Sequence, residues 1–575
     1  MGERVARLEA KLDELTAALR RLEARLAALE AAVGVADGPI TAASAAEAPT
    51  APAAALEPAR LPGALSLVGR SFLVLGGAFL VRALTEAGSL PRPAGVALGL
   101  LYAVTWIALA GREGRKREAA SAAFHGVTAV VIAFPLVFEA TTRFGVLSGR
   151  SAAGAVAAVG GACLAVAWRE RLHALAWAAT LASLATVVAL LRATHAIEAL
   201  TCVLLLLGIA TLWLSYDRDW YFLRWPPALA ADLAVMLMAS LVAREGGPPE
   251  AYRDLSLPGA VALTMALPLL YLSSFAVRTL ARDRDVVPFE AFQTLATLFA
   301  GFGGALDVAR SAGFGATGLG ATALTLGAGC YAVAFAFVER RPGSARNFLF
   351  YSSLALVLLL SGSAPALGAA FLAVFWCTLG LAAAVAGGLF DRSTLRAHSA
   401  VYVAAAALQS QLLVSSLDAF SAPAELSRPA LTPAALLVLV VAAACYFVLV
   451  AMPSAREQRW PARLPEVAHA LFGVVGAGAV AVLCLAWLVG VGHDPAALAA
   501  VRTLVLSVAA LALAASGRSA WLPGLAWLAY PVLVAGGLKL LAEDLPRGRP
   551  GTLFLAFVAY GLALIGTPRL LRPRA

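Results

Sequence analysis

The sequence has little charge and few of the side chains that carry out chemistry in water. Only 14% of its 575 residues are charged, 61% are hydrophobic, and the mean hydropathy is +0.83, which excludes an ordinary soluble fold. Its six cysteines lie singly in apolar runs, without the paired spacing of a zinc site or a disulfide framework. We interpret them as small packing residues and expect no metal and no cofactor.

The N-terminal residues, in contrast, carry charge beside a regular apolar stripe. From Val5 to Val33 the apolar side chains recur in alternating steps of three and four, which over four heptads predicts a coiled coil in residues 1–33. In a parallel pair, Arg4 and Arg25 meet Glu9 and Glu30 of a second chain, whereas an antiparallel pair brings like charges together. We therefore predict a parallel homo-oligomer through residues 5–33, with a solvated single helix as the alternative.

Two regions follow the coil. Residues 34–62 are rich in Ala and Pro, have little large apolar content, and are predicted to form a flexible tether. Residues 63–575 divide into apolar segments separated by short charged or Pro-containing loops, and a bilayer core needs about 20 apolar residues per helix. We predict an all-α, polytopic membrane protein with about 18 transmembrane helices. They are Ala64–Thr85, Ala94–Ala110, Ala119–Glu139, Ser151–Trp168, Ala174–Leu191, Ile197–Leu214, Ala228–Ala243, Pro258–Leu280, Pro288–Leu306, Gly313–Val338, Asn347–Ser361, Ala366–Leu389, Ala397–Leu417, Thr432–Met452, Val467–Val489, Leu498–Ser516, Trp521–Leu540 and Gly551–Thr567.

Basic residues alternate between the predicted loops. The loops after the even-numbered helices, with the C-terminal tail, hold 23 Lys and Arg residues, and the opposite loops hold 12. Because Lys and Arg concentrate in cytoplasmic loops, we expect both termini and the coil to be cytoplasmic. The net charge of +10 is then a consequence of topology, so we expect the lipid bilayer as a partner and no nucleic acid.

The coil, the tether and the first predicted helix together resemble a bacterial family. The segment Val68-Gly69-Arg70-Ser71-Phe72-Leu73-Val74-Leu75-Gly76-Gly77-Ala78-Phe79-Leu80-Val81-Arg82 has an early Arg, a Leu-rich middle, a Gly-Ala-Phe-Leu stretch and a closing basic residue. With the many short Ala/Leu helices that follow, it is similar to the predicted membrane proteins grouped as domain of unknown function 2339. The resemblance implies a multi-pass protein of the bacterial inner membrane and carries no activity.

A few polar side chains fall within the predicted helices, where such groups are costly and often functional. Most of them lie near a helix end, but Arg70, Arg82, His125 and Asp232 sit somewhat deeper, and Gln409 and Gln411 sit mid-helix. For each of them a functional and a structural role stay open. Polar residues closer to helix ends, among them Glu139, Glu290, His398, His469 and Lys539, we interpret as interface anchors that snorkel.

One pairing is specific enough to predict. The predicted helices of Arg70 and Asp232 both start at the cytoplasmic surface. Along its helix, Arg70 lies about 9 Å from that surface and Asp232 about 6 Å. An opposite charge at the same depth stabilises a charge in hydrocarbon, so we predict an Arg70–Asp232 pair. Glu290 is the competing partner.

Motifs for catalysis are weak. The histidines are scattered singly, no Walker-type Gly-rich loop occurs, and every predicted loop is short. We therefore expect no catalytic residue and lean away from an enzyme. Three classes stay open: a transporter or flippase of a lipid-linked or envelope-related substrate, which the number of helices favours; a membrane scaffold organised by the coiled coil; and a membrane-embedded transferase.

Overall fold

The structure, a computed structural model, describes only part of the chain. The described residues are 76–338 except 78, 345–422, 431–453, 464–490, 494–517 and 525–571. The chain divides into two units, Met1–Arg70 and Ser71–Ala575, and all described residues belong to the second. The predicted coil, the tether and most of the first predicted helix lie outside the described residues and stay predictions.

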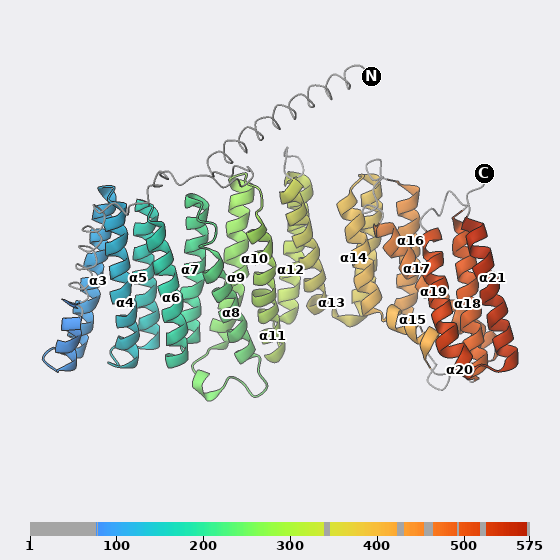
Figure 1. The fold of residues 1–575 in the computed structure, drawn as a ribbon, viewed down its shortest axis with the longest axis horizontal. Coiled ribbons are helices and arrows are strands. Elements are labelled where there is room, and N and C mark those ends of the chain that lie inside the picture. The colour runs from blue at the N-terminus through green and yellow to red at the C-terminus, as the bar shows by residue number, and fades with distance from the viewer. Residues whose placement is uncertain are drawn as a thin grey trace, which may run out of the picture. The chain divides into compact units, whose positions relative to one another are not determined.

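Every regular element among these residues is helical, which confirms the all-α prediction (Figure 1). A short helical segment at 79–86 precedes the long helices α3 (Arg92–Arg115), α4 (Ala119–Thr142), α5 (Gly149–Glu170), α6 (His173–Thr194), α7 (Ile197–Arg218), α8 (Trp225–Val242), α9 (Leu257–Ala276), α10 (Pro288–Thr297), α11 (Gly304–Ser311), α12 (Ala316–Ala332), α13 (Ala345–Leu389), α14 (Ser393–Gln409), α15 (Leu412–Ser421), α16 (Pro433–Ala451), α17 (Leu464–Val489), α18 (Pro495–Ser516), α19 (Ala529–Lys539) and α21 (Pro550–Leu571). Short segments join or continue them: η1 (Glu250–Tyr252), η2 (Val277–Ala281), η3 (Leu298–Gly303), η4 (Val333–Val338), η6 (Leu525–Leu528), η7 (Leu540–Asp544) and α20 (Leu545–Arg547).

The apolar helices match the predicted spans. In the described part, 16 helices are long and apolar enough to cross a membrane, and α14 with α15, bent by 60°, makes a seventeenth if the pair is one span. Each predicted span from Ala94–Ala110 to Gly551–Thr567 has a counterpart among them. The predicted spans Asn347–Ser361 and Ala366–Leu389 are the two parts of α13, which breaks at Gly368, where φ is 69°. The polytopic prediction is confirmed, and the full number of spans stays a prediction.

Local sequence explains where several helices begin. Proline occupies one of the first two positions of α3, α8, α9, α10, α16 and α18, where its missing N–H costs no helical hydrogen bond. The side chains of Ser148, Ser256 and Thr432 accept backbone N–H groups of the first turns of α5, α9 and α16. These starts fix which residues of each helix share a face.

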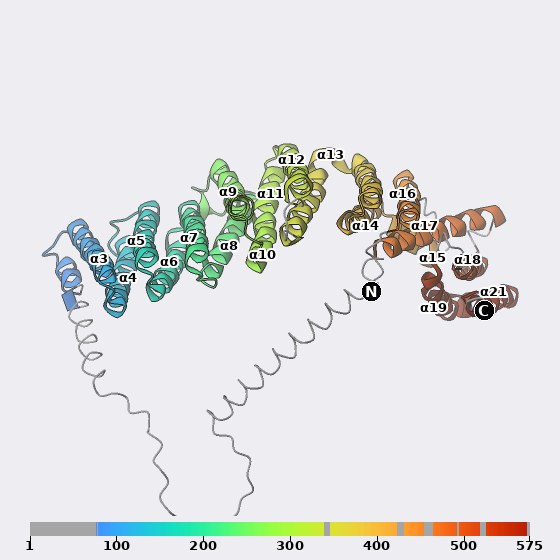
Figure 2. The same cartoon turned by 90° about the horizontal axis from the view of Figure 1, so that it is seen from above.

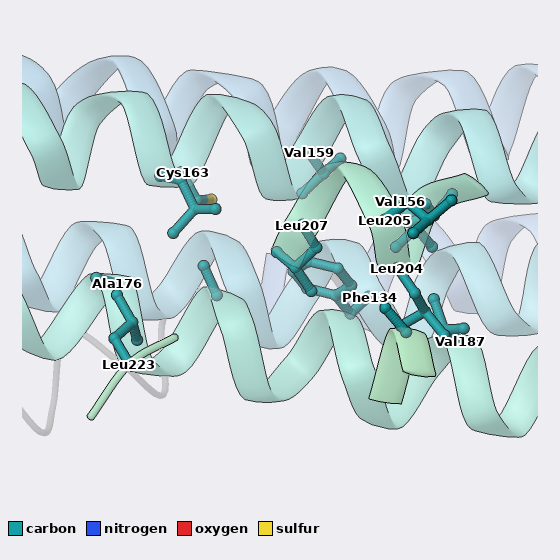
Figure 3. Close-up of a cluster of buried hydrophobic side chains, with 14 of the residues drawn as sticks. Phe134, Val156, Val159, Cys163, Ala176, Val187, Leu204, Leu205, Leu207 and Leu223 are labelled. Atoms are coloured by element: carbon teal, nitrogen blue, oxygen red, sulfur yellow. The ribbon is translucent and has the colours of Figure 1, made fainter. Parts of the chain in front are cut away.

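Each helix packs chiefly against helices that are near it in the chain, as the end-on view shows (Figure 2). Examples are α3 with α4, α5 with α6 and α7, and α12 with α13. In the core of the first helices, Phe134 of α4, Val159 of α5 and Leu207 of α7 meet (Figure 3). Successive membrane spans run in opposite directions, so the described loops at 112–117 and 278–284, which are rich in Lys and Arg, lie at the same set of helix ends, which we call the basic side (Figure 1).

Candidate functional site

Polar side chains from four neighbouring elements meet near the basic side of α7 to α10. We call Tyr216, Asp232, Arg278, Glu290 and Gln293 the polar cluster. Glu290 is fully buried, and its carboxylate accepts hydrogen bonds from Arg278 Nη1 at 3.0 Å and from the Tyr216 hydroxyl at 2.5 Å. Arg278 also lies over the ring of Tyr216, with its Cζ 4.8 Å from the ring centroid. A buried charge is tolerated when it is paired and hydrogen-bonded in this way.

The start of α10 positions Glu290. Pro288 opens the helix, and the Glu290 carboxylate turns back to accept the backbone N–H of Val287 at 2.9 Å. This satisfies a backbone donor that the helix itself leaves free and places the negative charge at the positive end of the helix. Glu290, Gln293, Thr294 and Thr297, which are spaced three and four residues apart, then form one buried polar face of α10.

Asp232 belongs to the cluster through an amide. Both of its carboxylate oxygens accept Gln293 Nε2, at 3.0 and 2.9 Å, and its side chain is buried. Asp232 is seven residues into α8, which places it about 10 Å along the helix. Gln293 was not among the candidates that the sequence suggested. Arg70 lies outside the described residues, so its pairing with Asp232 stays a prediction, while the competing partner Glu290 pairs with Arg278.

A second guanidinium lies at the edge of the cluster. Arg224, just before α8, is only 5% exposed, and its Cζ lies 4.4 Å from the ring centroid of Phe289. The rings of Tyr216 and Tyr221 follow at 5.7 Å each. Aromatic faces stabilise a desolvated cation by about 2 kcal/mol. The basic end of the cluster therefore carries two arginines around one buried glutamate.

The span that carries Glu290 and Gln293 contains a π-helical segment in its middle. After α10, the π-helical segment η3 leads into α11, and Gly301 in η3 lies against α9 at Pro268. Pro268 has no N–H for the carbonyl of Thr264, and a Cβ on Gly301 would lie 2.6 Å from that same oxygen. The proline of α9 and the glycine of η3 therefore allow the two helices to approach closely at the π-helical segment, and such segments occur frequently at functional sites.

Arg82 lies in an ionic group on the opposite side. It pairs with Glu86 at 2.9 Å and Glu139 at 3.0 Å, and Arg143 pairs with Glu86 at 2.8 Å. The hydrogen bond from Arg82 lowers the pKa of Glu86. This group ties the segment 79–86 to α4.

The other three candidates, His125, Gln409 and Gln411, lie outside the two ionic groups described so far. The ring of His125 lies 5.0 Å from that of Trp106, and its Nε2 is 3.4 Å from the Ser121 hydroxyl. Gln409 and Gln411 were expected in mid-helix, but they are exposed and flank the bend between α14 and α15, where Gln411 has a φ of 60°. The structure does not bring His125 or either glutamine into the polar cluster.

Two further groups correct the interpretation of end residues as snorkelling anchors. On the basic side, His469 is buried against Ser399 at 3.0 Å and His398 against the Tyr331 hydroxyl at 2.7 Å. On the opposite side, Lys539 pairs with Asp544 at 2.7 Å. Helices pack over these residues, so their polar ends find protein partners rather than the interface.

The polar cluster brings buried charges and hydrogen-bonding groups together in one place. Among the described residues, no three or more His, Cys, Asp or Glu side chains are arranged to hold a metal ion. Paired, desolvated ionisable groups inside membrane spans are typical of pathways for ions and substrates.

Comparison with known proteins gives a family without an activity. The model of the family described as predicted membrane protein (DUF2339) matches residues 64–570, so the chain belongs to this family. No curated protein and no solved structure matches it.

Proposed function

We propose that this DUF2339 protein is a transporter or flippase of a lipid-linked or envelope-related substrate in the bacterial inner membrane, with both termini cytoplasmic. The observation that carries the proposal is the span α10–η3–α11. One face of it holds the buried Glu290 and Gln293, and its middle is the π-helical η3, where Gly301 closely approaches Pro268. Buried ionisable residues are costly in hydrocarbon and mark ion and substrate pathways, and π-helical segments occur frequently at functional sites.

An apolar cavity of about 480 Å³ adds support from the other face of the same helix. It lies between α10 and the first part of α13 and is lined by Ala291 and Leu295 of α10. One helix thus borders both a polar cluster and a space suited to an apolar chain. An amphipathic substrate needs both environments.

A deletion strain tests this proposal. We expect profiling of its lipids and envelope glycans to reveal accumulation of a lipid-linked species, and the full chain to restore the normal profile. Glu290→Gln should fail to restore it, because the variant removes the buried charge that Arg278 and Tyr216 surround.

The matched control is Asp307→Asn on α11, in the same span. The Asp307 side chain is 66% exposed, and its ion pair with Arg310 is 3.7 Å long. An exposed pair of this kind contributes little, so removing the charge of Asp307 should leave restoration of the profile unchanged. An unaltered profile in the deletion strain, or equal restoration by both variants, would refute the proposal.

A further inference from the structure

We infer that the cavity beside α10 binds one phospholipid with an anionic headgroup, its chain lying in the cavity and its phosphate at Arg346. The inference rests on the proposed function and names the substrate class of that site. We call the cavity the lateral groove. Pro288, Ala291, Leu295 and Leu298 line it from one side, and Leu349 and Val357 line it from the other.

The length of the lateral groove matches one leaflet. Pro288 to Leu298 is ten residues and Arg346 to Val357 is eleven, so the groove extends about 15 Å along the helices. The hydrocarbon core is about 30 Å thick. An occupant that enters from the basic side therefore reaches the bilayer midplane and no further, which fits the chain of a lipid from one leaflet.

The groove is open to the side and closed at depth. Leu295 is 59% exposed and Leu349 is 58% exposed, so the walls face the surroundings of the protein. At the deep end, Leu298 and Leu354 are buried in a cluster with Phe302. This shape admits a chain laterally from the membrane and stops it at the midplane.

The mouth of the groove is positively charged and held in place. Arg346 lines it from the first turn of α13, the end of the helix at which the helix dipole also favours a negative charge. The buried Asn347 joins this turn to the other wall, because its Oδ1 accepts Val286 N at 2.8 Å and its Nδ2 donates to Arg284 O at 3.1 Å. A guanidinium binds phosphate with two parallel hydrogen bonds, so a phosphate-bearing headgroup complements the mouth.

Native mass spectrometry of the full chain in detergent, titrated with phosphatidylglycerol or phosphatidylcholine, tests the site. We expect one phosphatidylglycerol to bind about tenfold more tightly than phosphatidylcholine, which corresponds to roughly 1.4 kcal/mol. Arg346→Gln should remove this preference, and Ala291→Trp, which fills the groove from an exposed position, should weaken both lipids. Inorganic phosphate should not displace the bound lipid.

The matched control is Arg169→Gln, which removes an exposed arginine at the basic end of α5. Equal binding of the two lipids, displacement by phosphate, or the same result for Arg346→Gln and Arg169→Gln would overturn the inference. Because binding is measured without transport, a chain that binds phosphatidylglycerol but complements no lipid or glycan defect would sink the proposed function and leave this site standing.

Discussion

The ionic group between α18 and η7 gives the sharpest test of how this protein holds its helices together. Arg502 is 1% exposed; its Nη1 contacts Glu543 at 2.5 Å, and its Nε donates to the carbonyl of Ala419 at 2.8 Å. Asp544 accepts from Lys539 and from the Thr503 hydroxyl, at 2.7 and 2.8 Å. Two cations and two anions thus balance while almost fully removed from solvent.

Asp544→Asn keeps the shape of the group and removes one negative charge. Lys539 is then left with Glu543 at 3.5 Å, which Arg502 already occupies. An uncompensated buried charge costs about 3–5 kcal/mol, so we expect the free energy of unfolding to fall by that amount. Steric trapping of the full chain in bicelles measures it.

Asp494→Asn is the matched control for this prediction. Asp494 precedes α18, caps it through the N–H of Ala496 at 3.1 Å, and pairs with Arg549 at 3.2 Å on the surface. Asn caps a helix about as well as Asp, so only the exposed pair is lost, at a cost below about 1 kcal/mol. The double variant Lys539→Met/Asp544→Leu, which removes both charges of a pair, should recover most of the loss. An Asp544→Asn variant no less stable than Asp494→Asn would show that the group is not effectively buried.

The remaining predictions concern helix packing, topology and the coil. Gly301→Ala should destabilise the protein by about 1–3 kcal/mol, since the added methyl group meets the backbone of α9. Gly303→Ala in the same turn should leave the stability unchanged, because the nearest atom is 3.9 Å from the added Cβ. Equal thermal stability of the two variants would contradict the close approach of Gly301 to α9. Reporter fusions at Ala575 and in the loop at 490–495 should report opposite sides of the membrane, and the same side for both would mean that the span count is wrong. A cysteine at Leu15 should cross-link to the same position of a second chain; no cross-link there, with cross-linking instead between positions near Leu8 and Leu29, would mean antiparallel pairing.

Much of the fold was predictable because it depends on quantities that the sequence carries directly. Apolar length predicts a membrane helix, and charged or Pro-containing breaks predict its ends, so the predicted spans from Ala94–Ala110 onward each found a counterpart. The breaks within helices were harder. Gln409 and Gln411 were expected in one helix, yet Gln411 adopts a positive φ at a 60° bend. No Gly or Pro at this point of the sequence indicates the bend.

The partners of the buried polar residues were less predictable, since sequence position gives the depth of a residue in a span but not the direction in which it faces. Lys539 was interpreted as an anchor at the interface because it is near a helix end. The structure instead turns it toward Asp544 and Glu543, which follow it in the π-helical η7. The spacing of Lys539 and Glu543, four residues apart, was the available signal.

The polar cluster shows how a search for opposite charges overlooks neutral partners. The sequence matched Asp232 with Arg70, a pairing that stays a prediction, and among the described residues both of its oxygens accept the amide of Gln293. An amide satisfies a carboxylate without a second desolvated charge, whose removal from water costs several kcal/mol. The sequence did hold a signal, because Glu290, Gln293, Thr294 and Thr297 repeat with helical period inside an apolar segment. A polar stripe of that kind on a membrane helix must face protein, and the first place to search for the partner of a buried Asp is therefore the polar face of a neighbouring helix.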